Sequence, residues 1–237
     1  MALTLYLLLN LAVLWIVAKA SRSGGLTLVL VLFTMAFIVG SANNLLEAVV
    51  YGVLSVPEAL SAAIPAAIIF AILCPAAILL AGRFRAPKGA EEEVPKLSLY
   101  AALAVIVAYE LLYWTAGHLI FPYIAHFYAS KTIPPIYMVA GLQVVRSLIF
   151  LAAVYPLLRT GLRAAPIVLA LVFSIIGGVA PLLPDNPYMP PDIRFYHGIE
   201  TSLSNFLFGL FIGYLFSRSS PPGLTRTAAY PGLSGSS

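Results

Sequence analysis

The sequence predicts an all-α fold: a polytopic bundle of seven transmembrane helices, with the N-terminus outside and the C-terminus inside. Three observations predict it. Hydrophobic residues make up 61% of the 237 positions and charged residues only 9%, and the mean hydropathy is +0.98. Apolar runs recur that are long enough to cross ~30 Å of hydrocarbon. These runs are continuous and do not alternate with period two, which favours helices over a membrane barrel.

Seven apolar runs reach the required length, and each is expected to form one helix. They are Leu3–Ala18, Leu26–Leu54, Glu58–Ala81, Leu97–Phe121, Ile136–Leu158, Ala164–Leu183 and Phe195–Phe216. The second run would give ~43 Å of continuous helix, which exceeds the hydrocarbon thickness. We therefore expect it to tilt, protrude or break, and Gly40 followed by Ser41 marks the expected bend.

Basic residues in the connectors predict the orientation. If the connectors alternate sides, ten basic residues lie on one side and two on the other. The ten are Lys19, Arg22, Arg83, Arg85, Lys88, Lys96, Arg159, Arg163, Arg218 and Arg226, and the two are Lys131 and Arg194. Basic residues accumulate in cytoplasmic loops, so the richer side is expected to be cytoplasmic and the protein to lie in the inner membrane.

The chain is expected to divide into one transmembrane domain, residues 1–217, and a disordered cytoplasmic tail, residues 218–237. The tail is rich in Pro, Gly, Ser and Thr and cannot build a core. The acidic triplet Glu91–Glu93 is expected in a solvated loop. The letters "AKAS" at Ala18–Ser21 resemble a signal-peptide cleavage site, but no basic segment precedes the first run, which favours a retained first helix.

Charge and cysteine content exclude other classes. The net charge is +4, and the basic residues are scattered between the apolar runs and form no dense patch. We therefore expect the lipid bilayer as a partner and do not expect nucleic acid. Cys74 is the only cysteine and has no partner for an intrachain disulfide.

A few ionisable residues fall inside the predicted spans, where such residues are costly and usually serve a function. They are Glu47, Glu110, His118, Arg146, His197 and Glu200, with Asn43, Asn44, Gln143, Ser204 and Asn205 as uncharged companions. Topology places Glu47, His118, His197 and Glu200 near the outer ends of their spans. Glu110 and Arg146 fall close to the midplane, and an ion pair between them is expected.

Helical phase groups these residues on faces. In the seventh run His197, Glu200 and Ser204 share one stripe, which we expect to face inward. A neighbouring stripe of small residues is typical of close helix packing and predicts a surface for homo- or hetero-oligomers; it consists of Gly198, Ser202, Gly209 and Gly213. With polar stripes on the second, fourth and fifth runs, the pattern predicts an outward-facing polar pocket.

Several functions fit such a pocket. The preferred hypothesis is binding or transport of a small polar solute or ion, with Glu47, Asn43, Asn44, Glu110, His118, Arg146, His197, Glu200 and Asn205 as ligand-binding or proton-coupling residues. The main alternative is an intramembrane enzyme acting on a lipid or lipid-linked substrate at the outer interface, with Glu200 or Glu47 as base. Two further alternatives are structural. The protein could be a subunit that packs through its glycine face, or the polar residues could form a hydrogen-bonded network that only holds the helices together.

Cofactor hypotheses rest on the histidines. His197 and Glu200, three residues apart on one helix, could bind a divalent metal together with Glu47. Haem held by His118 and His197 is a weaker possibility.

The segments "ANNLLEA", "YELLYWTAG", "PYIAHFYA", "QVVRSLIF" and "NPYMPPDIRFYHGIETSLSNFLFG" resemble a group of bacterial polytopic membrane proteins with NNxxEA and HxxExxxxNFxFG-like segments. This resemblance implies a multi-helix bundle and supplies no chemistry. The letters "YELLY" also resemble the glutamate motif of the CAAX-protease family, but the paired glutamate and the following arginine of that motif are missing here.

Overall fold

The computed structural model describes residues 1–85, 96–129, 133–186 and 189–217, and this part of the chain is helical and contains no strand. Seven helices are long and apolar enough to cross a membrane, which confirms the predicted polytopic helical class. The elements are α1 (Ala2–Ala20), α2 (Gly25–Phe37), η1 (Ile38–Ala42), α3 (Asn43–Val50), α4 (Val56–Leu80), α5 (Leu99–Tyr128), α6 (Ile136–Leu158), α7 (Ala165–Leu171), η2 (Val172–Val179), η3 (Ala180–Leu182) and α8 (Pro191–Ser217). The predicted tail (218–237), Lys88, Glu91–Glu93 and Lys131 lie outside the described residues.

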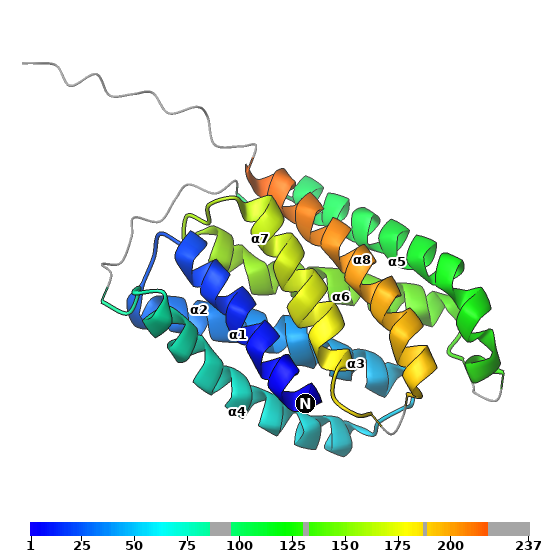
Figure 1. Ribbon diagram of the computed structural model, residues 1–237. Coiled ribbons are helices and arrows are strands. Elements are labelled where there is room, and N and C mark those ends of the chain that lie inside the picture. Colours follow the sequence, from blue (N-terminus) through cyan, green and yellow to red (C-terminus); the bar gives the residue numbers. More distant parts are fainter. Residues whose placement is uncertain (86–95, 130–132, 187–188, 218–237) are drawn as a thin grey trace, which may run out of the picture.

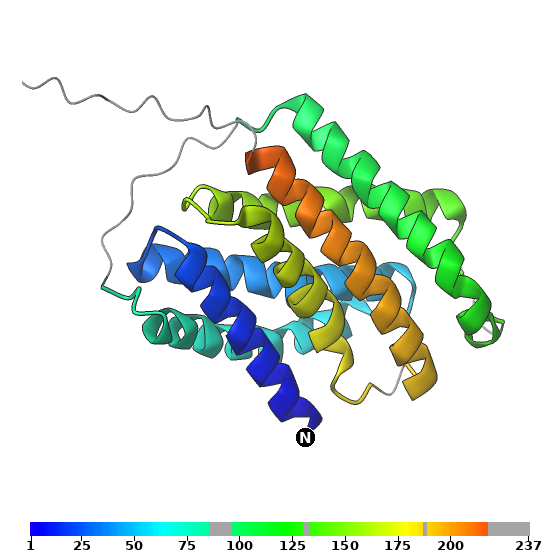
Figure 2. The same ribbon diagram turned by 45° about the horizontal axis from the view of Figure 1, so that its top comes forward.

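The helices form two layers. One contains α1, the α7–η2–η3 span, α8 and α5 side by side, and the other contains α4, the α2–η1–α3 span and α6 (Figure 1; Figure 2). α8 packs between α7 and α5, and α6 packs against α5 and α2. The layers meet where α1 contacts α4 and where η1 contacts η2.

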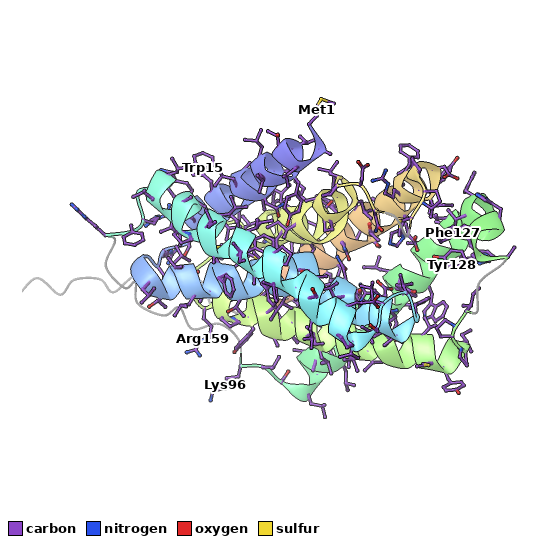
Figure 3. All side chains as sticks on the ribbon, turned by 90° about the horizontal axis from the view of Figure 1, so that it is seen from below. Met1, Trp15, Lys96, Phe127, Tyr128 and Arg159 are labelled. Carbon is purple, nitrogen blue, oxygen red and sulfur yellow. The ribbon has the colours of Figure 1, made fainter. Side chains whose placement is uncertain are left out.

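The bundle has two chemically different ends. At the basic end lie the connectors that carry Arg22, Arg83, Arg159 and Arg163, and the far end carries the α3–α4 connector and the start of α8. Figure 3 shows Lys96 and Arg159 toward one end of the bundle and Phe127 and Tyr128 toward the other.

Two connectors are tied together at the basic end. The buried Ser21 hydroxyl donates to Thr160 Oγ1 at 2.9 Å, and the Arg163 N–H donates to the Ala20 carbonyl at 3.0 Å. These bonds join the α1–α2 connector to the α6–α7 connector.

Local sequence signals set the helix ends at the far end. Ser55 and Glu58 form a capping box at the start of α4, in which each side chain accepts a bond from the other residue's backbone N–H. Gly52 ends the preceding helix with a φ of 66°, a left-handed conformation that glycine adopts without a steric penalty. Its N–H bonds to the Val49 carbonyl and the Val53 N–H bonds to the Ala48 carbonyl, which is the bonding pattern of a Schellman motif.

The second span departs from α geometry where a bend was expected. Gly40 and Ser41 lie in η1, a π-helical segment. At its end the Asn43 N–H donates to the Ile38 carbonyl, five residues back, which is the hydrogen bond typical of a π-helix. A Cβ on Gly40 would lie 2.9 Å from Ile176 Cγ2, so glycine is needed where η1 meets η2. The span ends at Val50, before the predicted Leu54, because Gly52 terminates it.

Aromatic rings fill the core between the layers. Phe150, Phe173 and Phe208 are almost fully buried, and they pack edge-on or tilted with centroids 5.1–6.2 Å apart. Tyr109 joins them at 4.8 Å from Phe208. This aromatic core connects α5, α6, η2 and α8, and so fixes the relative positions of the helices that carry the polar side chains.

The small-residue stripe of α8 does pack closely, and it does so inside the chain. A Cβ on Gly209 would lie 2.4 Å from the Leu169 carbonyl oxygen, and one on Gly213 would lie 2.3 Å from Pro166 Cα. Two turns further toward the far end, Gly178 of η2 lies against the Ser202 backbone. The face predicted for oligomer contacts is therefore covered by α7 and η2, and oligomer formation stays a prediction.

Candidate functional site

Side chains from four spans meet toward the far end of the bundle, and we call this group the polar cluster. Its members lie on α3 and the residue that follows it, and on α5, α6 and α8, which belong to the second, fourth, fifth and seventh spans. They are Asn43, Glu47, Tyr51, Tyr113, Gln143, Arg146, His197 and Glu200. Their use as ligand-binding residues stays a prediction.

An ion pair between α3 and α6 is the centre of the polar cluster. Arg146 Nη1 lies 2.7 Å from Glu47 Oε1 and also donates to Gln143 Oε1 at 3.1 Å. The Arg146 side chain is only 8% exposed and that of Glu47 is 24% exposed. The guanidinium also lies 5.9 Å from the centroid of the Tyr109 ring, so the aromatic core forms the floor below it.

The predicted ion pair between Glu110 and Arg146 is wrong. Glu110 Oε2 instead accepts a 2.7 Å bond from Trp114 Nε1, one turn further along α5. Glu47 takes the arginine because α3 ends early, at Val50, while α6 continues beyond it toward the far end. A residue near the end of α3 is therefore level with the middle of α6.

A second polar pair lies on α8. His197 Nδ1 is 3.0 Å from Glu200 Oε2, as the shared helical face predicts, and the side chains are 28% and 13% exposed. The other oxygen, Oε1, faces α5, where a Cβ on Gly117 would lie 3.4 Å from it and within 4 Å of no other described atom outside α5. The charges of Glu47 and Arg146 also act on the His197 ring, which connects the two pairs electrostatically.

Tyrosines surround the two pairs, and none of them is among the predicted ligand-binding residues. The hydroxyls of Tyr51 and Tyr113 are 3.0 Å apart. Both Glu47 and Glu200 act electrostatically on Tyr51 and on Tyr128, the last residue of α5. The spacing of Tyr51, four residues after Glu47, was a usable signal. For Tyr128 the signal was the i, i+4, i+15 spacing of Tyr113, Gly117 and Tyr128 on one face of α5.

Several buried polar atoms of the polar cluster have no hydrogen-bond partner. Within the described residues, buried side-chain atoms without one are Asn43 Nδ2 and Oδ1, Glu110 Oε1, Gln143 Nε2, Arg146 Nε and Asn10 Oδ1. All except those on Glu110 and Asn10 belong to the polar cluster. The described residues offer these atoms no hydrogen-bond partner. Each unpartnered buried polar atom costs about 1–3 kcal/mol.

The other predicted residues are placed differently. His118 is exposed on α5 and takes part in no hydrogen bond or ion pair with the described residues. Asn44 is half-buried on α3. Asn205 is buried on α8, where its Nδ2 lies 3.6 Å from the position of a Cβ on Gly177. The structure thus does not bring His118 into the polar cluster.

The predicted metal site is not supported by the geometry. In the part of the chain that the structure describes, no three His, Cys, Asp or Glu side chains form a group that could hold a metal ion. Glu47, the expected third ligand beside His197 and Glu200, binds Arg146 instead. The haem hypothesis needs two facing histidines, but His118 is exposed while His197 is hydrogen-bonded to Glu200.

The third histidine belongs to a separate contact at the far end. His126 Nε2 lies 3.3 Å from Asp192 Oδ2, and both side chains are more than half exposed. Beside them the rings of Tyr123 and Tyr196 stack with centroids 5.1 Å apart. These contacts hold the end of α5 against the first turns of α8.

Comparisons with known proteins give no match: no family model, curated protein or solved structure is significantly similar to this chain. The functional argument therefore rests on the polar cluster.

Proposed function

We propose that this multi-pass membrane protein binds a small polar solute or ion in the polar cluster and moves it across the membrane or senses it there. The observation that carries the proposal is the set of unpartnered atoms on Asn43, Gln143 and Arg146. Hydrocarbon offers these atoms no hydrogen-bond partner, and the protein offers none either. A polar solute with its water would provide the missing partners.

The charged groups have distinct roles in this proposal. Arg146 stays protonated and holds the Glu47 carboxyl group beside the solute. Glu200 faces the solute, and His197 gains or loses a proton as Glu200 changes partner. The partial exposure of Glu47, His197 and Glu200 supports access from the far end of the bundle, which the distribution of basic residues predicts to be the outer side.

The proposal is tested by binding and uptake. A panel of alkali cations, methylammonium, acetate, glycerol and amino acids is screened for stabilisation of the purified protein, because a ligand that binds the native state raises its thermal midpoint. Any solute that stabilises the protein is then followed into proteoliposomes. Asn43→Leu should keep or raise the intrinsic midpoint, because it removes two unpartnered atoms, yet weaken binding at least about tenfold. Glu47→Gln should abolish uptake.

Asn10→Leu is the matched control. Asn10 is also fully buried with an unpartnered oxygen, but it lies on α1, which packs against α4, α7 and η2. This variant should bind the solute like the wild type. Equal binding by Asn43→Leu and wild type, or stabilisation by no member of the panel, would contradict the proposal.

A second candidate function is an intramembrane enzyme that acts on a lipid or lipid-linked substrate at the outer interface. The hydrogen bond between His197 and Glu200, half-buried near the far end, favours it, because such a pair can exchange a proton with a substrate. Glu200 or Glu47 would act as general base and His197 as acid or base. Conversion of lipid extract to a new product by the wild type, lost in Glu200→Gln, would favour this function over transport.

A further inference from the structure

We propose, on the basis of the proposed function, that the ligand of the polar cluster is a small organic cation carrying an ammonium group. It would sit between the carboxylates of Glu200 and Glu47 and the rings of Tyr51, Tyr113 and Tyr128. Charge, wall chemistry and space support this ligand class.

The charges of the polar cluster do not balance while His197 is neutral. It contains two carboxylates, Glu47 and Glu200, against the guanidinium of Arg146 and the imidazole of His197. With His197 neutral the net charge is −1, and with His197 protonated it is zero. Other nearby cations have partners of their own: Arg194 bonds to Asp185 and the Pro184 carbonyl, and His126 pairs with Asp192. A ligand with one positive charge would reduce the cost of this excess.

The walls favour an ammonium group over a metal ion. An inorganic cation needs several oxygen ligands around one point, and the described residues contain no group of three His, Cys, Asp or Glu side chains able to hold one. Tyrosine rings, by contrast, attract cations through the negative face of the ring. Tyr51 and Tyr128 both lie close enough to Glu47 and Glu200 to interact electrostatically, and Tyr113 is bonded to Tyr51.

Space for the ligand lies in front of Glu200. Gly117 is on the face of α5 between Tyr113 and Tyr128, and among the described residues outside its own helix only Glu200 Oε1 lies within 4 Å of the position of its missing Cβ.

The test measures binding of methylammonium and tetramethylammonium to the full-length purified protein by calorimetry, with sodium, potassium and acetate as comparisons. The organic cations should bind and the comparison ions should not. Tyr128→Leu should weaken binding about tenfold whereas Tyr128→Phe, which keeps the ring, should not. Glu200→Gln should weaken it at least as much, and Gly117→Leu should block it by filling the space. Tyr100→Leu, an exposed position on the first turn of the same helix, is the remote control.

The outcomes separate this inference from the proposed function. Binding of sodium or potassium that is insensitive to Tyr128→Leu, or binding of acetate but not methylammonium, would overturn the ammonium assignment while leaving solute binding intact. Organic cation binding that survives both Glu200→Gln and Tyr128→Leu would overturn it as well. Failure of every solute to bind would overturn both. Thermal unfolding of each variant without ligand identifies any variant that fails to fold, and in that case Tyr113→Leu and Tyr113→Phe replace the pair at position 128.

Discussion

A guanidinium ten residues into a membrane-spanning helix requires a carboxylate at the same depth, and Arg146 finds one in Glu47. The pair is asymmetric, because Arg146 is nearly enclosed while Glu47 remains in part accessible. Loss of the carboxylate therefore leaves a buried cation, whereas loss of the arginine leaves an anion that can still be hydrated. This asymmetry sets the order of the expected mutational effects.

Glu47→Gln should lower the free energy of unfolding by about 3–5 kcal/mol, because it leaves Arg146 buried without a counterion. Arg146→Met should cost less, and the double variant Glu47→Gln/Arg146→Met should recover most of the loss of the first. Denaturant titration in mixed micelles measures all three. Asp185→Asn is the control, since Asp185 is fully exposed and pairs of this kind, here with Arg194, contribute only about 0–1 kcal/mol. A double variant no more stable than Glu47→Gln would contradict the energetic role of the pair.

The residues of the polar cluster were easier to predict than their partners. Depth along each run selected Glu47, Arg146, His197 and Glu200, since ionisable residues in hydrocarbon are rare and costly. Local spacing also placed His197 and Glu200 side by side, because residues three apart on a helix are neighbours, and the structure adds a hydrogen bond between them. The partner of Arg146 depends on where two distant helices end relative to each other, which no local pattern in one sequence encodes.

At the scale of elements, two π-helical segments meet in the middle of the bundle. Gly40 of η1 lies against Ile176 of η2, and Gly177 of η2 lies against Val39 of η1, so the glycines of each segment receive a side chain of the other. Asn43 follows η1 directly and Glu47 lies one turn later. The contact between η1 and η2 therefore helps to set the positions of Asn43 and Glu47 on α3. The sequence predicted an irregularity at Gly40 but offered no signal for η2.

The glycines of α8 give a prediction at this scale. Gly213→Ala should destabilise the bundle by about 1–3 kcal/mol or more, because the new methyl group would overlap the backbone of Pro166. Gly141→Ala in α6 is the matched control: nothing lies within 4 Å of its Cβ position, so the substitution should gain roughly 0.5–1 kcal/mol. Thermal unfolding in detergent measures both. Similar midpoints for the two variants would show that α7 and α8 are not packed as described.

At the scale of the whole molecule, the seven spans and their order followed from hydropathy alone, because the length of an apolar run is fixed by the thickness of the hydrocarbon. The layer arrangement could not be predicted in this way, since every run is apolar on most faces and the sequence does not say which faces meet. The orientation remains a prediction from the basic residues of the connectors.

Orientation can be tested by cysteine labelling in a Cys74→Ala background, since Cys74 is buried and is the only cysteine. Val53→Cys, in the α3–α4 connector, should react with a membrane-impermeant maleimide in intact cells. Leu97→Cys, just before α5 at the basic end, should react only after lysis. Both positions are exposed. The reverse pattern of labelling would invert the orientation.

The pairing of Glu47 with Arg146 has a consequence for biosynthesis. The two charges belong to the second and fifth spans, with two further spans made between them. When the second span leaves the ribosome, Arg146, the partner of Glu47, has not yet been made. Arg146 without Glu47 would in turn cost about 2.5–3.5 kcal/mol on entering lipid near the centre of the fifth span. The second span must therefore remain where water can reach it until the fifth arrives, so that spans two to five settle into the bilayer as one cooperative group.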